Sequence, residues 1–138
     1  MTLQRDKLYL GMANKLAKFS TCLDKQVGCL LVDKDHFIIA TGYNGAPHKY
    51  PHCTDNSFCR KVAGEACLSA HAEQNALIQC NNFKRIYTCY TTLSPCITCI
   101  KMLMNTPCKR IIYLHEHRDP VPRELWEQTG GIWQCLSI

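Results

Sequence analysis

The chain has 138 residues, of which 46% are apolar, and this suits one domain over residues 1–138 with its own hydrophobic core rather than a disordered segment. No apolar run approaches the roughly 20 residues that cross a bilayer, and charged residues interrupt the N-terminal stretch too often for a signal peptide, so we expect no membrane partner. The net charge of +5 at neutral pH suits an anionic ligand but does not require a nucleic acid.

The first half of the chain predicts a helix, a hairpin and a long loop. Over residues 3–19, apolar side chains recur at helical spacing. Two apolar runs, 27–32 and 37–43, are separated by the loop Asp-Lys-Asp-His, which predicts two antiparallel strands. Residues 44–69 show no period and are rich in Gly, Pro, His, Cys and charge. A loop of this length in a compact domain is usually functional or held by a metal.

From residue 69 onward, predicted helices alternate with predicted strands. The helices are expected over residues 69–80, 94–105 and 120–131, and the strands over 85–92, 109–116 and 131–138. Ser94 is expected to cap the second of these helices, with Pro95 as its first helical residue. The alternation predicts parallel strands joined by right-handed crossovers. We therefore expect an α/β fold, a three-layer α/β/α sandwich around a mixed five-stranded sheet.

Eleven cysteines are many for a chain of this length. A disulfide scaffold is disfavoured because the chain is long enough to fold around its own core. Cys29, Cys89 and Cys135 also lie in apolar, strand-like runs, where reduced cysteine packs as a small hydrophobic residue. The sequence therefore predicts a cytoplasmic protein in which some reduced cysteines bind a metal.

Metal-ligand side chains stand at the start of two predicted helices. His71 and Glu73 open one helix, and Cys96 and Cys99, in a P-C-x-x-C motif, open the next. A helix N-terminus favours thiolate, and sulfur combined with imidazole selects zinc. With His71, Cys96 and Cys99 as ligands, a tetrahedral zinc keeps one position for water, which is the catalytic pattern. Glu73 is then expected to stay off the metal and to carry protons.

The two motifs together, H-x-E and P-C-x-x-C, are typical of zinc-dependent nucleobase deaminases, although either half alone could be a structural zinc half-site, a redox pair or chance. The segments ATGYNGAP (40–47), HAEQNAL (71–77) and TTLSPCITC (91–99) resemble the deoxycytidylate deaminase family. The resemblance extends over roughly residues 5–115. It implies a cytidine deaminase-like fold and zinc-dependent hydrolysis of dCMP to dUMP and ammonia, which supplies dUMP for thymidylate synthesis.

The resemblance also implies substrate contacts and partners. Asn44, Ala72 and Ser94 would contact the nucleotide, although an Asn-Gly pair is also a common turn. Many family members are homo-oligomers, often hexamers, with dCTP and dTTP as effectors and Mg2+ bound alongside the allosteric nucleotide. The substrate phosphate needs cations, and the sequence cannot choose among the available ones. These are Lys25, Lys49, Arg60, Lys61 and Arg118.

Four further cysteines lie around the long unpatterned segment. Some relatives carry a second, structural zinc in this region. A closed four-sulfur site would be made by Cys22, Cys53, Cys59 and Cys67, with His52 as a substitute ligand. Such a site would help to fold the loop. Cys67, four residues before His71, is then expected to face away from the catalytic metal. The alternative is that these cysteines are ordinary free thiols.

Two other functions stay open at this point. Another deaminase of the same superfamily, acting on adenosine in tRNA, on guanine or on dCTP, would share both motifs. A tRNA enzyme should carry a denser basic surface than a net charge of +5 indicates, so a nucleic-acid partner is not expected. A zinc-binding module without activity would not need Glu73.

Overall fold

The computed structural model describes residues 2–56, 60–61, 64 and 67–138. Its helices are α1 (Leu3–Leu16), η1 (Ala17–Phe19), α2 (Cys53–Asn56), α3 (Ala72–Gln79), η2 (Phe83–Arg85), α4 (Ile97–Met104) and α5 (Val121–Gln128). Its strands are β1 (Gly28–Val32), β2 (Ile38–Tyr43), β3 (Thr88–Leu93), β4 (Arg110–His115) and β5 (Ile132–Cys135). Within the described ranges, no helix has the length and apolar character needed to cross a bilayer.

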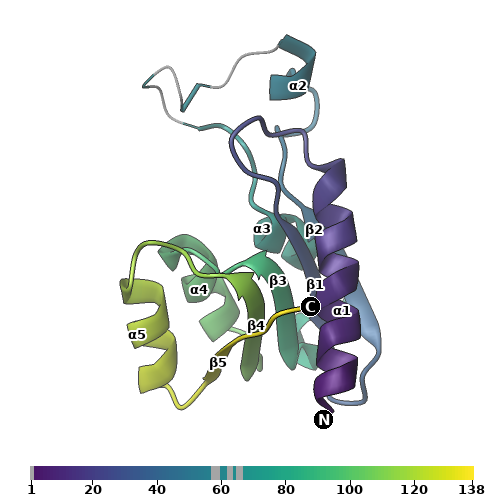
Figure 1. Ribbon diagram of the computed structural model, residues 1–138, viewed down its shortest axis with the longest axis vertical. Helices are drawn as coiled ribbons and strands as arrows, with labels where there is room; N and C mark the ends of the chain where they lie inside the picture. Colours follow the sequence, from purple (N-terminus) through teal and green to yellow (C-terminus); the bar gives the residue numbers. More distant parts are fainter. Residues whose placement is uncertain (1, 57–59, 62–63, 65–66) are drawn as a thin grey trace.

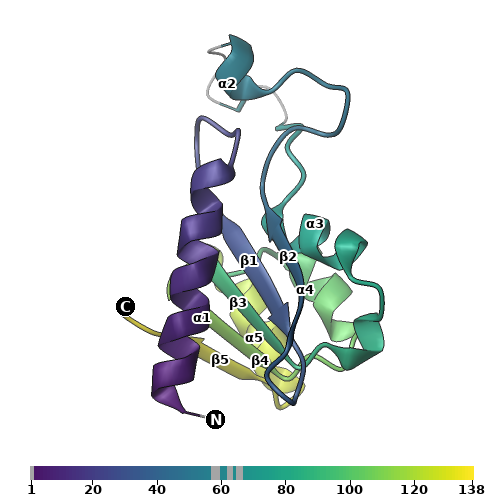
Figure 2. The ribbon, with the colours of Figure 1, turned by 90° about the vertical axis from the view of Figure 1, so that its right-hand side faces the viewer.

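The five strands form one mixed sheet in the order β2-β1-β3-β4-β5. β1 runs antiparallel to both β2 and β3, whereas β3, β4 and β5 run parallel to one another. Helix α1 lies on one face of the sheet, and α3, α4 and α5 lie on the other (Figures 1 and 2). The predicted three-layer α/β/α architecture is therefore confirmed.

Strand β1 lies between helices on both faces, and all five of its residues are buried. Leu30 packs with the α1 side of the core, whereas Leu31 packs with the α3 and α4 side, as the period of two in a strand requires. At its start, Gly28 has no room for a side chain. A Cβ atom there would lie 2.0 Å from the Ala13 carbonyl oxygen. The glycine thus allows the end of α1 to touch β1, and this contact directs the loop that follows α1.

A buried charged cluster joins α1 to the centre of the sheet. The Arg110 guanidinium donates to the Asp6 carboxylate at 2.7 Å, and the Tyr90 hydroxyl donates to the same carboxylate at 2.6 Å. All three residues are at least nine-tenths buried. Because a buried charge is costly without a partner, this cluster fixes the position of α1 over β3 and β4.

The ends of the long loop are held together by a two-residue bridge. Gly45 donates to the Ala70 carbonyl at 3.1 Å, and Ala70 donates to the Gly45 carbonyl at 2.7 Å. The chain therefore leaves the sheet and returns at one point, which brings Asn44 and His71 to the same region. Within the loop, the short helix α2 was not predicted from the sequence.

Several predicted boundaries were wrong, and the structure gives the reasons. The residue that caps α4 is Cys96, not Ser94, because the Ser94 hydroxyl accepts a hydrogen bond from the His117 N–H at 2.7 Å. Helix α3 begins at Ala72 rather than Ser69, and its cap is His71. Both shifts place a predicted metal ligand at a helix cap.

Asp33 closes the β1–β2 hairpin with a buried carboxylate. It accepts the N–H groups of Phe37 at 2.9 Å and Asp35 at 3.0 Å, and it forms an ion pair with Arg85. Burial alone would raise the pKa of Asp33, but the hydrogen bonds from Phe37, Arg85 and Asp35 outweigh burial and lower that pKa.

We predict that Asp33→Asn lowers the free energy of unfolding by about 1–3 kcal/mol at pH 7, because the charged acceptor is lost. A lowered folded-state pKa contributes stability above the unfolded pKa, near 4, and this contribution disappears as the pH falls through the folded value. Urea unfolding should therefore show a gap between wild type and variant that narrows as the pH falls below the unfolded pKa, near 4. Asp35→Asn, at an exposed position of the same loop, is the control. A gap that stays constant from pH 7 to pH 3 would contradict this account.

Candidate active site

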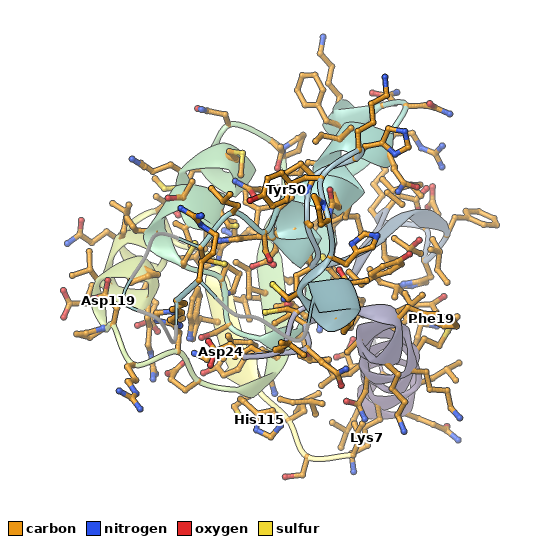
Figure 3. All side chains as sticks on the ribbon, turned by 90° about the horizontal axis from the view of Figure 1, so that it is seen from above. Lys7, Phe19, Asp24, Tyr50, His115 and Asp119 are labelled. Carbon is orange, nitrogen blue, oxygen red and sulfur yellow. The ribbon has the colours of Figure 1, made fainter. Side chains whose placement is uncertain are left out.

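A pocket of about 250 Å3 lies where the carboxyl ends of β3 and β4 meet the start of α3 and the loop after α1. Figure 3 looks down on this end of the molecule, with Asp24 near the middle of the view and Phe19 and Asp119 toward opposite margins. His71, Glu73 and Cys96 line this pocket together with Asp24 and Lys61. Glu73 is buried, whereas the side chains of Asp24 and Lys61 are 31% and 55% exposed.

Three of the predicted metal ligands converge at this pocket. His71 Nδ1 lies 3.4 Å from the Sγ of Cys96 and 3.4 Å from the Sγ of Cys99, and all three donor atoms lie within 4.8 Å of one another. A tetrahedral zinc with bonds of about 2.0 Å to nitrogen and 2.3 Å to sulfur would hold such atoms about 3.6 Å apart. The donor set therefore fits zinc. No other group of three or more His, Cys, Asp or Glu donors converges in this way within the described part of the chain.

The two cysteines of this group differ in protonation, because Cys96 favours the thiolate and Cys99 favours the thiol. The Cys99 thiol donates to Cys96, and this hydrogen bond, with a further one from His71, lowers the pKa of Cys96 to about 3. The same contact and burial raise the pKa of the Cys99 thiol. Cys96 also stands at the cap of α4, where the helix dipole favours a thiolate. Its hydrogen bond to His71 in turn raises the pKa of that imidazole.

Glu73 lies in the first turn of α3 and lines the same pocket, but it is not part of the converging group of ligand atoms. Only 4% of its surface is exposed. Burial raises its pKa to about 7, although its own backbone N–H acts in the opposite direction. A carboxyl group with this pKa can both accept and release a proton near neutral pH.

The three predicted substrate residues all line the pocket, and the side chains of Asn44 and Ser94 are already held by hydrogen bonds within the protein. Asn44 accepts the Val27 N–H at 2.8 Å and donates to the Lys25 carbonyl at 2.8 Å, so its amide holds the loop that forms one wall. Ala72 lines the pocket at the start of α3. Ser94 lines it as well, and its hydroxyl holds His117 in place.

His117 is a pocket residue that the sequence interpretation did not single out. It follows β4, just as Ser94 follows β3. Side chains placed after the carboxyl ends of parallel strands meet at one edge of a sheet, and that position was the available signal. Of the cations considered for a phosphate, Lys25 and Lys61 line the pocket. Within the described residues, Lys49, Arg60 and Arg118 do not.

The described members of the predicted four-cysteine site do not converge. Cys22 is buried, Cys53 is half-buried in α2, and Cys67 is exposed. Cys67 lines the same pocket as His71 and does not turn away from it as expected. The fourth member, Cys59, lies outside the described residues, so the four-cysteine site stays a prediction.

A family model for the cytidine and deoxycytidylate deaminase zinc-binding region matches residues 3–115. A deoxycytidylate deaminase of Mycobacterium phage D29 is 34% identical over 125 residues, which cover 80% of this chain and 94% of the phage protein. The deoxycytidylate deaminase of Saccharomyces cerevisiae is 31% identical over 120 residues, and the match covers 82% of this chain but only 38% of the yeast protein. The chain thus spans well under half the length of that relative.

Among solved structures, the dCMP deaminase of cyanophage S-TIM5 in complex with dCMP and dUMP is similar to the whole chain. The TM-score is 0.84, the sequences are 25% identical, and the alignment covers 99% of each chain. This likeness supports the assignment of the sheet order and of the helix layers described above.

We predict that His71→Ala and Cys96→Ser each lower the zinc content of the purified protein by about one ion per chain, because three ligands are needed to hold it. Elemental analysis after dialysis measures this loss directly. Cys135→Ser is the matched control, since Cys135 is exposed on β5 and does not line the pocket. Unchanged zinc content in both His71→Ala and Cys96→Ser would rule out this metal site.

Proposed function

The chain belongs to the cytidine and deoxycytidylate deaminase family, and from this premise we propose that it hydrolyses dCMP to dUMP and ammonia. The observation that carries the proposal is the meeting of His71, Cys96 and Cys99 beside the buried Glu73 in one pocket. The names of the phage and yeast relatives, and the nucleotides bound in the cyanophage structure, support dCMP as the substrate. The reduced cysteines that the site needs suit the cytoplasm.

His71, Cys96 and Cys99 would hold the zinc, which when bound supplies a Lewis acid that makes water acidic near neutral pH. Glu73 takes a proton from the attacking water and delivers it to the ring nitrogen N3 of cytosine. The new C4 hydroxyl then gives up its proton, which Glu73 passes to the leaving amino group. The bond from C4 to the amino nitrogen breaks, a carbonyl forms at C4, and ammonia leaves. The burial of Glu73 suits this role because a carboxyl with a pKa of about 7 exchanges protons readily at neutral pH.

The other pocket residues suit a nucleotide. Val27, Ala72 and Leu93 give the pocket an apolar surface, and such a surface favours a planar base. Asn44 fixes the Val27 wall through its amide, because its Oδ1 accepts the Val27 N–H and its Nδ2 donates to the Lys25 carbonyl. Lys25 and Lys61 offer positive charge to a phosphate.

We predict that Glu73→Gln lowers kcat for dCMP by about 100-fold or more, the usual contribution of a positioned proton carrier. Zinc content should not change, since the amide replaces a side chain that does not ligate the metal. Ammonia release and elemental analysis on the same preparation separate the two properties. Glu124→Gln, at an exposed position of α5, should keep full activity. Intact turnover in Glu73→Gln would refute the assigned role.

The competing deaminase functions make different predictions for substrate choice. We expect ammonia release from dCMP to exceed that from CMP, deoxycytidine, dCTP, guanine and a tRNA anticodon hairpin, because the pocket has a volume of only about 250 Å3 and is lined by Lys25 and Lys61. A preference for the hairpin, guanine or dCTP would instead favour another enzyme of the superfamily. Absence of release from every substrate, with zinc bound, would favour a zinc-binding module.

The family also suggests finer properties for this chain. We infer a second zinc held by Cys22, Cys53, Cys59 and Cys67, which predicts about two zinc ions per chain by elemental analysis. A value of about one would overturn that inference. From the same family resemblance, we propose that the chain forms a homohexamer. We also propose that dCTP and dTTP regulate it, with Mg2+ bound beside the effector. Sedimentation and initial rates with each nucleotide would test it.

A further inference from the structure

We propose that the ion pair between Asp24 and Lys61 occupies the phosphate subsite of the pocket, and that Lys61 exchanges Asp24 for the substrate phosphate. The inference rests on the proposed function and names the residues that would select a nucleotide over a nucleoside. Lys61 Nζ lies 2.9 Å from Asp24 Oδ2, across 37 positions of the sequence, and both side chains line the pocket.

The placement of the pair identifies two lysines that could bind the phosphate, Lys61 itself and Lys25, the sequence neighbour of Asp24. Asp24 and Lys25 are adjacent in the loop after α1, and Asn44 fixes this loop by accepting the Val27 N–H and donating to the Lys25 carbonyl. Lys61 comes from the long loop on the other side. A base held near Glu73 leaves the remainder of the pocket for the sugar and the phosphate. Among the described residues that line the pocket, the lysines are Lys25 and Lys61.

The exposure of the pair makes an exchange of partners inexpensive. The Lys61 side chain is 55% exposed and that of Asp24 is 31% exposed. Ion pairs in such surroundings contribute only about 0–1 kcal/mol to stability. A phosphate monoester carries about 1.5 to 2 negative charges near pH 7 and has three acceptor oxygens, whereas a carboxylate carries one charge. Lys61 therefore gains a stronger partner when the nucleotide binds.

Asp24 has an active part in this arrangement. Its Oδ2 lies 2.9 Å from Lys61 Nζ, so the Asp24 carboxylate is the partner that the substrate phosphate must displace. Without Lys61, an arriving phosphate would meet the bare Asp24 carboxylate and be repelled. Without Asp24, Lys61 would have no competing anion. Removal of the Lys61 charge must therefore weaken phosphate binding, and removal of the Asp24 charge must strengthen it.

A purely structural role for the pair makes a different prediction. If the ion pair only tied the long loop to the loop after α1, removal of either partner would break the same contact. Asp24→Asn and Lys61→Met would then have equal effects of the same sign, and they would change the kinetics of nucleotide and nucleoside alike.

The test is the KM and kcat for dCMP and for deoxycytidine in the full-length, zinc-loaded protein. Lys61→Met should raise the KM for dCMP by about tenfold or more, while kcat/KM for deoxycytidine changes less than about twofold. Asp24→Asn should lower the KM for dCMP, and the double variant should lie between the two single variants. Lys49→Met is the matched control, since Lys49 lies in the same long loop but does not line the pocket.

Equilibrium binding of dUMP separates a failure of this inference from a failure of the proposed function. If wild type binds dUMP but does not turn over dCMP, the proposed function fails. Weaker dUMP binding in Lys61→Met and tighter binding in Asp24→Asn would still support the exchange of partners. Shifts of the same sign in both variants, or no shift in either, overturn the inference even where dCMP is turned over. Zinc content and deoxycytidine turnover show that each variant is folded.

Discussion

Two helix N-termini meet at one point in this fold, and the candidate active site depends on that meeting. His71 caps α3 and Cys96 caps α4, so both helices direct their partial positive charge at the same space. Two like partial charges repel unless something negative lies between them. The Cys96 side chain, with its pKa lowered to about 3, supplies that charge. The arrangement therefore favours thiolate ligands and a cation before any substrate arrives.

The close contact of α3 with β2 explains why Glu73 is buried. A Cβ atom at Gly42 would lie 2.3 Å from the Ala72 carbonyl oxygen and 2.6 Å from the Ala76 nitrogen. Without a side chain at Gly42, the helix backbone rests directly on the strand. Glu73, one residue after Ala72, is then held in the interior, where burial raises its pKa to about 7. A close backbone contact in the core thus sets the acidity of a carboxyl in the pocket.

The parts of this structure that sequence reasoning could predict are those fixed by neighbouring residues. Hydrophobic periodicity gave the alternation of helices and strands, and the spacing of His71, Cys96 and Cys99 at helix starts gave the metal ligands. The cap of α4 was misplaced because Ser94 bonds to His117, a contact that no local pattern encodes. The pairing of Asp24 with Lys61 spans 37 positions and likewise leaves no local signal. Only the fold could select Lys25 and Lys61 from the available cations.

The residues of the pocket differ in their exposure to water, and this difference suits them to different tasks. Burial raises the pKa of Glu73 to about 7, so this carboxyl can hold a proton near neutral pH, where an exposed carboxyl would not. Around Asp24 and Lys61, solvent screens the charges, and their attraction is weak enough to be exchanged. If the lysine were as deeply buried as Glu73, breaking its pair would leave an uncompensated charge and cost several kcal/mol. An exposed pair in the same pocket as a buried carboxyl would therefore allow the phosphate of the proposed substrate to bind and leave while Glu73 stays protected from solvent.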